Sequence, residues 1–401
     1  MIITSLLDTD TYKFKMLQYF LEYHPTIEVE WELKNRSKVE IFNLIDRGRL
    51  KEELACCQSL TFSGDELGYL ESLKIYQPKF LLFLRNFRLP DIQIEDNTIR
   101  VNGPIIQTSL WETFCLSILN ELYCETLYES YTQEQIRARA ISQLTSKLIN
   151  LTASSRVTFI EFGSRRRFSK AIQDLLVECT LRSLLLSFDY QPLTGTSNVF
   201  LAKKYGIPAI GTMAHEVDLV TQGLCNTEDE LRNSPYEIMD RWEKLYDYDD
   251  RVYLPDTYGS WYTLSHMPDE KFRTWRGFRW DSGDPCSFSN IILSRYARLN
   301  INSMDHLITY SDGMEVPLML GLWDRYHEHI AMPIGWGSNF TNDIPGISQP
   351  LSIVMKVVSS NGKRVAKLSD NPYKATGDPD VVEYLRRVFE YGDRGGSIPK
   401  Y

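Results

Sequence analysis

The segment Arg279-Trp280-Asp281-Ser282-Gly283-Asp284-Pro285 combines a cation, two carboxylates and a hydroxyl group within a few residues. Similar segments of small, charged and hydroxyl-bearing residues recur along the chain, nearly all of them after a short apolar run. They are Glu161-Phe162-Gly163-Ser164-Arg165-Arg166-Arg167, Gly195-Thr196-Ser197-Asn198, Gly211-Thr212-Met213-Ala214-His215-Glu216, Ser311-Asp312-Gly313 and Gly335-Trp336-Gly337-Ser338. Polar groups at the ends of buried parallel strands are typical of the catalytic face of an α/β barrel.

The apolar runs predict where these strands lie. Short runs bounded by Gly and Asp indicate buried strands, and the candidates include 157–160, 184–188, 209–210, 307–310 and 331–334. Amphipathic helices are predicted over 133–151 and 169–181. We interpret 191–195 as a turn or strand boundary and 240–251 as a solvated helix or loop. Six or seven strand candidates favour an irregular α/β barrel over an open sheet.

The first third of the chain has a different, mixed pattern. A helix is predicted over 11–23, with Asp8, Thr9 or Asp10 as its cap, followed by a strand over 27–33. A hairpin is predicted at 92–94 and 99–101. Ser109 and Glu112 resemble a capping box that opens a helix ending near residue 124. We therefore predict an α+β domain over 1–130 and a barrel domain over 131–350, with 350–401 packing back onto the first domain.

Composition excludes several classes of protein. The 401 residues are 43% hydrophobic and 24% charged, as in an ordinary globular protein, and the net charge of −9 disfavours nucleic acid as a partner. Seven cysteines without a Cys-x-x-Cys motif indicate neither a disulfide framework nor a zinc ribbon, which favours a reduced, cytoplasmic compartment. The sequence shows neither a secretory signal nor a membrane-spanning apolar run, so no membrane association is expected.

The residues of the opening segment suit a phosphorylated sugar. Arg279 can clamp a phosphate through two parallel hydrogen bonds. Asp281 and Asp284 can accept hydrogen bonds from a ribose diol or supply hard oxygen ligands to Mg²⁺. The alternative for this segment alone is a polar turn with a local ion pair. The repetition of such segments at successive strand ends favours a binding site.

Two later segments are candidate phosphate loops. Glycine lets backbone N–H groups approach a phosphate closely, and the loops after the late strands of a barrel are its usual phosphate site. The candidate residues are Ser311, Gly313, Gly335, Gly337 and Ser338. Tight turns that bind nothing are the alternative. The sequence contains no phosphate-binding loop of the Walker type, no dinucleotide fingerprint and no nucleophile elbow.

His215 is the candidate for covalent chemistry. It is one of six histidines, and a lone histidine in a loop is usually structural. Among so many candidate anion binders, a neutral imidazole can instead accept a phosphoryl group or act as a general base. We interpret the run His327-Glu328-His329 as a polar helix end rather than a metal site. The sequence therefore leaves the metal ligands open.

Taken in order, these segments closely resemble the nicotinate phosphoribosyltransferase family, of the type-II phosphoribosyltransferase class. The likeness runs almost end to end, from Asp10-Thr11-Tyr12-Lys13 to Val365-Ala366-Lys367-Leu368-Ser369-Asp370-Asn371-Pro372. The resemblance implies an irregular α/β barrel with an N-terminal sandwich-like domain. It also implies a homodimer with the site near the subunit interface.

The resemblance further implies a reaction, the first step of NAD salvage from nicotinic acid. Nicotinate, phosphoribosyl pyrophosphate, ATP and water would give nicotinate mononucleotide, pyrophosphate, ADP and phosphate, with Mg²⁺ as cofactor. The implied catalytic residues are His215, which ATP would phosphorylate, Arg279 and Asp281. Tyr12 and Phe162 are implied to sandwich the pyridine ring, with Tyr12 from the same or the neighbouring subunit. Ordinary core packing is the alternative for both rings.

Recognition of the pyridine's carboxylate is assigned to the basic run. Arg165 is our choice for this contact, with Arg166 and Arg167 as the next candidates. Thr196 and Ser197 are placed beside the substrate, and Ser197 favours an acid because relatives that use nicotinamide generally carry aspartate there. The alternatives are a nicotinamide or quinolinate phosphoribosyltransferase, or a non-catalytic nucleotide sensor.

Overall fold

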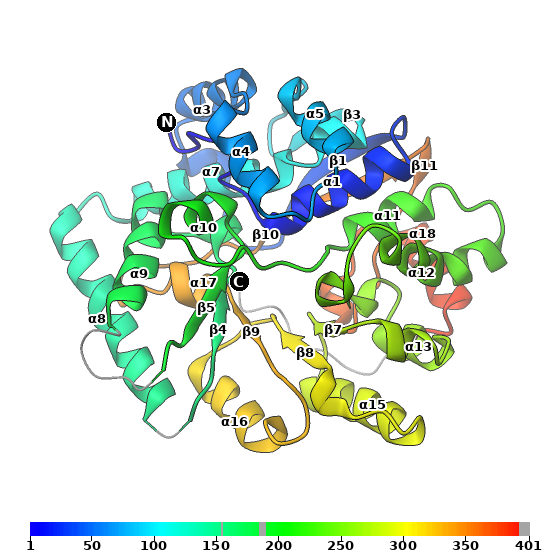
Figure 1. Ribbon diagram of the computed structural model, residues 1–401. Helices are drawn as coiled ribbons and strands as arrows, with labels where there is room; N and C mark the ends of the chain where they lie inside the picture. Colours follow the sequence, from blue (N-terminus) through cyan, green and yellow to red (C-terminus); the bar gives the residue numbers. More distant parts are fainter. Residues whose placement is uncertain (154, 184–189, 393–401) are drawn as a thin grey trace.

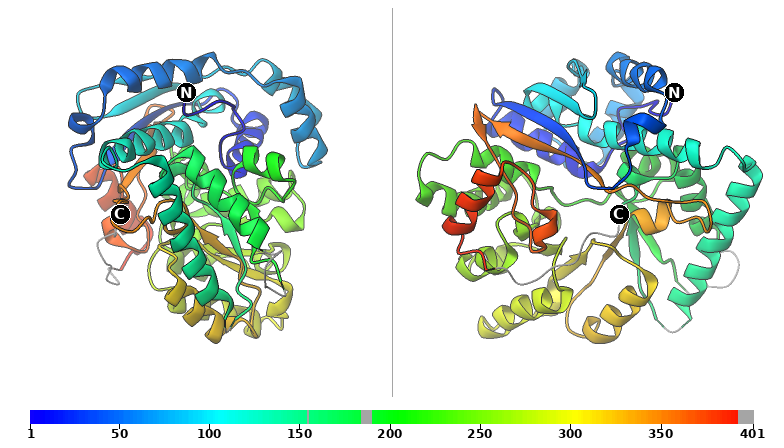
Figure 2. Two further views of the ribbon diagram at one scale, coloured as in Figure 1. Left: turned by 90° about the vertical axis from the view of Figure 1, so that its left-hand side faces the viewer. Right: turned by 180° about the vertical axis from the view of Figure 1, so that it is seen from behind.

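Two sheets organise residues 1–153, 155–183 and 190–392, the part of the chain that the computed structural model describes (Figure 1). One sheet has six strands paired in parallel, and the other has five antiparallel strands. Helices surround the parallel sheet, and elements of the N-terminal third lie at one end of it (Figures 1 and 2). The predicted α/β class with a parallel sheet and an N-terminal domain is confirmed. The boundaries at residues 130 and 350 stay predictions.

The parallel sheet has the strand order β5-β4-β9-β8-β7-β6. Its strands are β4 (Phe159–Glu161), β5 (Leu193–Thr196), β6 (Val252–Tyr253), β7 (Gly277–Trp280), β8 (Leu307–Tyr310) and β9 (Ile334–Trp336). All four residues of β7 are buried, as expected for a strand covered on both faces. A parallel bridge from Thr196 to Ala209 extends the β5 edge. This order is consistent with an irregular barrel, although the described residues include no pairing between β6 and that edge.

The antiparallel sheet joins the two ends of the chain. β1 (Glu28–Asn35) lies between β3 (Ile99–Pro104) and β10 (Ile353–Ser360), with β2 (Gln93–Ile94) and β11 (Lys363–Arg364) at the edges. β10 lies beside the N-terminal strand β1 in the view from behind (Figure 2). Residues near position 355 are therefore held on the N-terminal part of the protein, at the end of the parallel sheet.

The helices predicted over 11–23, 133–151 and 169–181 are confirmed, with shifts of at most two residues at their ends. The helices of the first third include α1 (Thr11–Tyr23), α3 (Arg47–Ser59), α4 (Gly64–Ser72), α5 (Pro78–Arg85) and α7 (Trp111–Leu127). Around the parallel sheet lie α8 (Gln133–Thr152), α9 (Lys170–Ser183), α10 (Val199–Tyr205), α11 (Glu216–Gln222), α12 (Glu228–Glu243), α13 (Ser260–His266), α15 (Pro285–Arg298), α16 (Val316–Tyr326), α17 (Ser338–Thr341) and α18 (Pro379–Val388). The His327-Glu328-His329 run follows the end of α16, as predicted. Within the described residues, no helix has both the length and the apolar character needed to cross a membrane.

Some predicted strands are placed differently. The run 209–210 forms only the single bridge at Ala209, and β5 occupies residues interpreted as a turn or strand boundary. The candidate 184–188 lies outside the described residues. β6 escaped prediction because it has two residues and follows the charged stretch 240–251. The prediction that this stretch is solvated is wrong for Trp242 and Tyr246, which are buried.

The predicted capping box at Ser109 and Glu112 is wrong. α7 begins at Trp111, and its N-cap residue makes no side-chain cap. The Glu112 carboxylate is instead 1% exposed and pairs with Lys13 at 2.7 Å, Lys356 at 3.0 Å and Arg165 at 3.4 Å. A buried carboxylate needs such partners, whereas a cap on an exposed helix end can be replaced by water.

No side chain caps the N-terminus of the first helix either. Asp10 occupies the N-cap position of α1, one of the three predicted, but makes no side-chain cap. Its carboxylate accepts hydrogen bonds from Tyr12 Oη at 2.8 Å and Ser197 Oγ at 2.6 Å. These bonds fix the start of α1 against the end of β5.

Lys13→Met tests the contribution of the buried charges to stability. Lys13 is fully buried between Glu112 and Glu216, at 2.7 and 2.5 Å. Its removal leaves buried carboxylates underpaired, so we expect the free energy of unfolding to fall by about 3–5 kcal/mol in urea denaturation. Lys79→Met is the control, because Lys79 forms an exposed pair with Glu22 that contributes less than about 1 kcal/mol. Equal effects of the two substitutions would contradict this role for Lys13.

Candidate active site

A cavity of about 720 Å³ lies where the parallel strands end. Residues that directly follow β4, β7, β8 and β9 line it, together with residues of β10 and of the C-terminal segment 367–374. The candidate site residues on its wall are Phe162, Arg165, His215, Arg279, Asp281, Asp284, Ser311, Gly313, Gly337 and Ser338. The repeated polar segments of the sequence therefore meet in one place.

The cavity is cationic although the chain is acidic. Seven cationic side chains line it, and they are Arg36, Arg165, Arg166, Arg279, Lys356, Lys367 and Lys374. Among the described residues, only four carboxylates do so, namely Asp281, Asp284, Asp312 and Glu315. Because the whole chain carries a net charge of −9, this local excess of positive charge indicates a site for a strongly anionic ligand.

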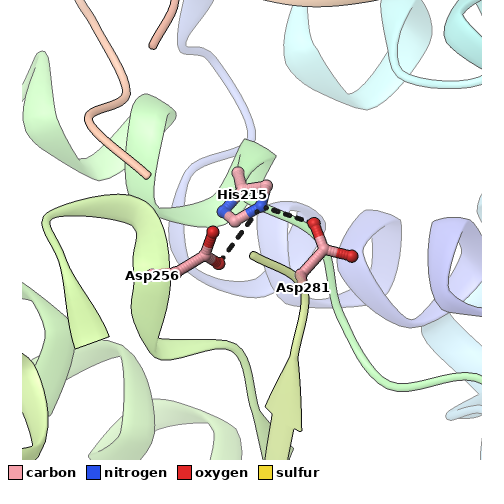
Figure 3. A group of neighbouring side chains, drawn as sticks. All are labelled: His215, Asp256 and Asp281. Atoms are coloured by element: carbon pink, nitrogen blue, oxygen red, sulfur yellow. Dashed lines mark hydrogen bonds and ion pairs between the residues drawn. The ribbon is translucent and has the colours of Figure 1, made fainter. Parts of the chain in front are cut away.

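His215 lies on the cavity wall at the N-terminus of α11. Its Nε2 atom is 3.4 Å from Asp281 Oδ2 and 3.5 Å from Asp256 Oδ1, so the ring lies between two carboxylates (Figure 3). Lys367 Nζ is closer still, at 2.7 Å from Nε2. Burial and the Lys367 ammonium lower the pKa of His215 to about 4, against the opposite effect of the two carboxylates. The imidazole is therefore neutral near pH 7.

Arg279 connects β7 with the segment that carries His215. Its Nη1 atom donates to Thr212 Oγ1 at 2.8 Å and to the Met213 carbonyl oxygen at 2.7 Å. The side chain is only 7% exposed, and its Nε atom has no hydrogen-bond partner among the described residues. Arg279 thus positions residues 212–213 and keeps a buried N–H group that a ligand can satisfy.

The loop after β7 provides two carboxylates with different surroundings. Asp281 is 29% exposed and accepts a hydrogen bond from Ser311 Oγ at 3.1 Å. Asp284 caps α15 by accepting from the Ser287 N–H at 2.7 Å. The turn between them requires glycine, because Gly283 has a φ of +77° and lies against Asp370. Asp281 is therefore the carboxylate of this loop that lies against His215, whereas Asp284 is exposed and caps a helix.

Four candidate site residues do not line the cavity. Thr196 Oγ1 donates to Glu161 Oε2 at 2.5 Å, and the buried Ser197 Oγ donates to Asp10. A Cβ atom at position 335 would lie 2.5 Å from the Phe162 ring. Glycine at this position therefore leaves the space that the ring occupies. The hydroxyl groups of Thr196 and Ser197 are therefore bonded to other residues of the protein and do not line the cavity.

Tyr12 is also set back from the cavity. Its ring lies 5.7 Å from the Arg165 guanidinium, and it is buried. Arg165 itself is 35% exposed on the wall, paired with Asp10 and Glu112. Within the chain, Tyr12 therefore supports Arg165 from behind. The other two arginines of the run differ: Arg166 lines the cavity, whereas Arg167 is buried in a bidentate pair with Asp8.

Comparison with known proteins assigns the family. The profile of the nicotinate phosphoribosyltransferase family matches residues 157–393, and that of its N-terminal domain matches residues 7–120. The chain belongs to the nicotinate phosphoribosyltransferase family. A solved nicotinate phosphoribosyltransferase from Vibrio cholerae is 28% identical, with a TM-score of 0.87 over 98% of this chain and 95% of that one. One from Porphyromonas gingivalis is 28% identical, with a TM-score of 0.84 over 97% and 100%.

Several residues in or behind the cavity wall of this family member were not singled out from the sequence. Asp256 follows the unpredicted strand β6, and Lys367 lies 152 positions from His215, which it contacts. Arg36 and Lys356 reach the cavity from the antiparallel sheet. Of these four residues, the sequence pointed only to Lys367, because it lies within the 365–372 motif. The other three could not be recognised because their contacts depend on the packing of the two sheets.

Lys374→Met tests the cavity as an anion site. Lys374 Nζ lies 2.5 Å from Asp312 and 3.1 Å from the Asp281 carbonyl oxygen on the cavity wall. Inorganic pyrophosphate should bind the unmodified protein in isothermal titration calorimetry. The substitution should weaken that binding at least about tenfold, because a hydrogen bond to a charged group contributes about 1.5–3 kcal/mol. Lys79→Met serves again as the control, and equal affinities in both variants would exclude Lys374 from the anion site.

Proposed function

We propose that this protein transfers the phosphoribosyl group of phosphoribosyl pyrophosphate to nicotinate, releasing pyrophosphate, as the first step of NAD salvage from nicotinic acid. We also propose that ATP hydrolysis is coupled to this reaction through phosphorylation of His215. Membership of the family supports the first statement. The observation that carries the second is a neutral, buried imidazole on the wall of a cavity lined by seven cations.

The reaction requires the protein to stabilise charge both on the ribose carbon and on the departing pyrophosphate. Departure of pyrophosphate leaves positive charge on the ribose carbon and negative charge on the leaving group. Asp281, the carboxylate of the β7 loop that lies beside His215, would face the sugar. Arg279 and Lys374 would hold the leaving phosphates. The 5′-phosphate would bind at the late-strand loops, whose residues are Ser311, Gly313, Gly337 and Ser338.

The pyridine would bind against Phe162, with its carboxylate at Arg165. Both side chains line the cavity, and Gly335 leaves room for the Phe162 ring. The pyridine nitrogen must then approach the ribose carbon in line with the leaving group. Water must be excluded, because it would react at the same carbon. The homodimer implied by the resemblance remains a prediction, as does a contribution of Tyr12 from a partner subunit.

The cavity residues fit Mg²⁺ bound mainly through substrate phosphates. Asp281 offers the hard oxygen ligand that this ion prefers. His215, Asp256 and Asp281 present ligand atoms within 4.8 Å of one another, but Lys367 Nζ already lies 3.0 Å from Asp256 and 2.7 Å from His215. A dication at the centre of that group would face an ammonium, so Asp281 is the ligand we assign. When bound, Mg²⁺ would neutralise phosphate charge.

A pyrophosphate-release assay with three pyridines tests the substrate assignment. With phosphoribosyl pyrophosphate and Mg²⁺, nicotinate should give a much larger kcat/KM than nicotinamide, because Arg165 provides a cation for its carboxylate. Quinolinate should react poorly, because its second carboxylate lacks an assigned partner. A preference for either alternative pyridine would contradict the proposal, and release with none of the three would favour a nucleotide sensor.

His215→Asn tests the coupling to ATP. The amide lacks the nucleophilic lone pair of imidazole, so incorporation of the ATP γ-phosphoryl group into protein should be abolished. Ribosyl transfer without ATP should persist at reduced efficiency, because Arg279 and Asp281 are still present. The measurement is radiolabel incorporation beside pyrophosphate release with and without ATP. Full ATP stimulation in this variant would exclude a phosphohistidine at position 215.

A further inference from the structure

The buried side of His215 is connected to a carboxylate that the proposed chemistry does not use. His215 Nδ1 lies 2.9 Å from Thr257 Oγ1, and Thr257 Oγ1 lies 3.0 Å from Asp218 Oδ2. The Tyr253 hydroxyl group reaches the other oxygen of Asp218 at 2.8 Å. All four residues are less than 5% exposed. A continuous chain of hydrogen bonds therefore runs from the cavity wall into the protein.

The cavity side of the ring determines where its proton lies. Lys367 Nζ is 2.7 Å from His215 Nε2. An ammonium group has three hydrogens to donate and no lone pair, so it can only donate in this contact. Nε2 must therefore be the acceptor. A nitrogen that accepts a hydrogen bond carries no hydrogen, so the N–H group of the ring is at Nδ1.

The remaining donors and acceptors then follow one by one. With the proton on Nδ1, Thr257 Oγ1 accepts from His215. The single hydrogen of the Thr257 hydroxyl group is free to point at Asp218 Oδ2. Asp218, which has one carboxylate oxygen for Thr257 and one for Tyr253, accepts both bonds. Every polar atom along this chain is satisfied, as buried groups require.

The opposite tautomer places an N–H group against the Lys367 ammonium and leaves Asp218 Oδ2 without its donor. A proton on Nε2 would point toward the Lys367 ammonium at 2.7 Å. Thr257 would have to donate to Nδ1, and Asp218 Oδ2 would lose its donor. Asp256 and Asp281 could accept from an Nε2–H, but they lie at 3.5 and 3.4 Å. The bonds of Asp256 to Lys367 and Ser282, at 3.0 and 2.6 Å, are made by its Oδ2 atom, whereas Oδ1, the oxygen nearer to Nε2, has no hydrogen-bond partner among the described residues.

We infer that Thr257 and Asp218 are positioning residues that hold His215 in the Nδ1–H tautomer and direct the lone pair of Nε2 toward the cavity. The role we give them in phosphoryl transfer rests on the proposed function. In that step the Nε2–P bond forms while the bond from phosphorus to the ADP oxygen breaks, and the electron pair leaves with ADP. The proton stays on Nδ1. The incoming phosphoryl group displaces the Lys367 ammonium from Nε2.

The same arrangement stabilises the ring as it gains charge. Attack by a neutral imidazole leaves positive charge on the ring. Asp218 lies beyond Thr257 on the side away from the phosphoryl group; burial raises its pKa to about 7, and its ionised form is the one that stabilises the charged ring. A carboxylate serves a histidine in this way in serine hydrolases, where loss of the correct tautomer strongly reduces the rate. Here a hydroxyl group intervenes, so we expect about a 10- to 100-fold effect, the range found for residues that orient a metal-binding histidine.

Thr257→Val removes the acceptor for Nδ1–H with little change of volume, and Thr257→Ser restores a hydroxyl group. Thr263→Val is the matched control, because Thr263 is also buried and its hydroxyl group has no partner among the described residues. Two readouts are needed for each variant. Nitrogen-15 NMR of the ligand-free protein reports which ring nitrogen of His215 carries the proton, with His215→Asn used to assign the signal. Radiolabelled ATP with Mg²⁺ reports the rate of phosphohistidine formation.

The expected results differ between the variants. The unmodified protein, Thr263→Val and Thr257→Ser should show the Nδ1–H form. Thr257→Val should shift the ring toward Nε2–H and slow phosphohistidine formation about 10- to 100-fold. An Nε2–H form in the unmodified protein would overturn the inference, as would equal tautomers and rates in Thr257→Val and Thr263→Val. If the unmodified protein takes up no phosphoryl group, the proposed coupling fails, while the NMR comparison still decides the role of Thr257.

Discussion

The cluster around Glu112 connects the N-terminal part of the protein with the cavity. This buried carboxylate binds Lys13 of α1, Lys356 of β10 and Arg165 of the loop after β4. Burial would raise the pKa of Glu112, but these cations, Lys13 above all, hold it well below the ordinary value. The resulting stabilisation is present above the ordinary pKa of a glutamate and is lost as the pH falls toward the lower, folded-state value. Three segments far apart in sequence are thereby joined at one point.

The cations that line the cavity depend on the same interaction. Arg165 and Lys356 line the cavity, and both are paired with Glu112. Buried cations without a carboxylate would be costly, so Glu112 allows positive charge to be collected at the strand ends. A second cluster repeats this principle, because Asp256 holds Lys367 next to His215. Carboxylates behind the cavity wall therefore make the cationic cavity possible in an acidic protein.

Much of the fold and part of the site could be predicted from local patterns. The helices at 11–23 and 133–151 and the strand at 307–310 follow from apolar periodicity, whereas β10, one of the two longest strands, was not predicted. Polar segments after strands predicted the cavity wall, as for Asp281 and Ser311. The capping box at Glu112 failed because a local rule was applied to a residue whose partners lie as far as 244 positions away. Ser197 was expected beside the substrate, yet its hydroxyl group bonds to Asp10. Such pairings are set by packing between distant segments, which one sequence does not reveal.

A crystal structure with nicotinate mononucleotide and pyrophosphate bound would test the central claim most directly. The account predicts the pyridine against Phe162 with its carboxylate at Arg165, and the ribose facing Asp281. The 5′-phosphate should lie at the loops containing Ser311 and Ser338. Both ligands should occupy the cavity at the ends of the parallel strands. Ordered ligands bound elsewhere, or a pyridine carboxylate directed away from the arginines, would contradict the account.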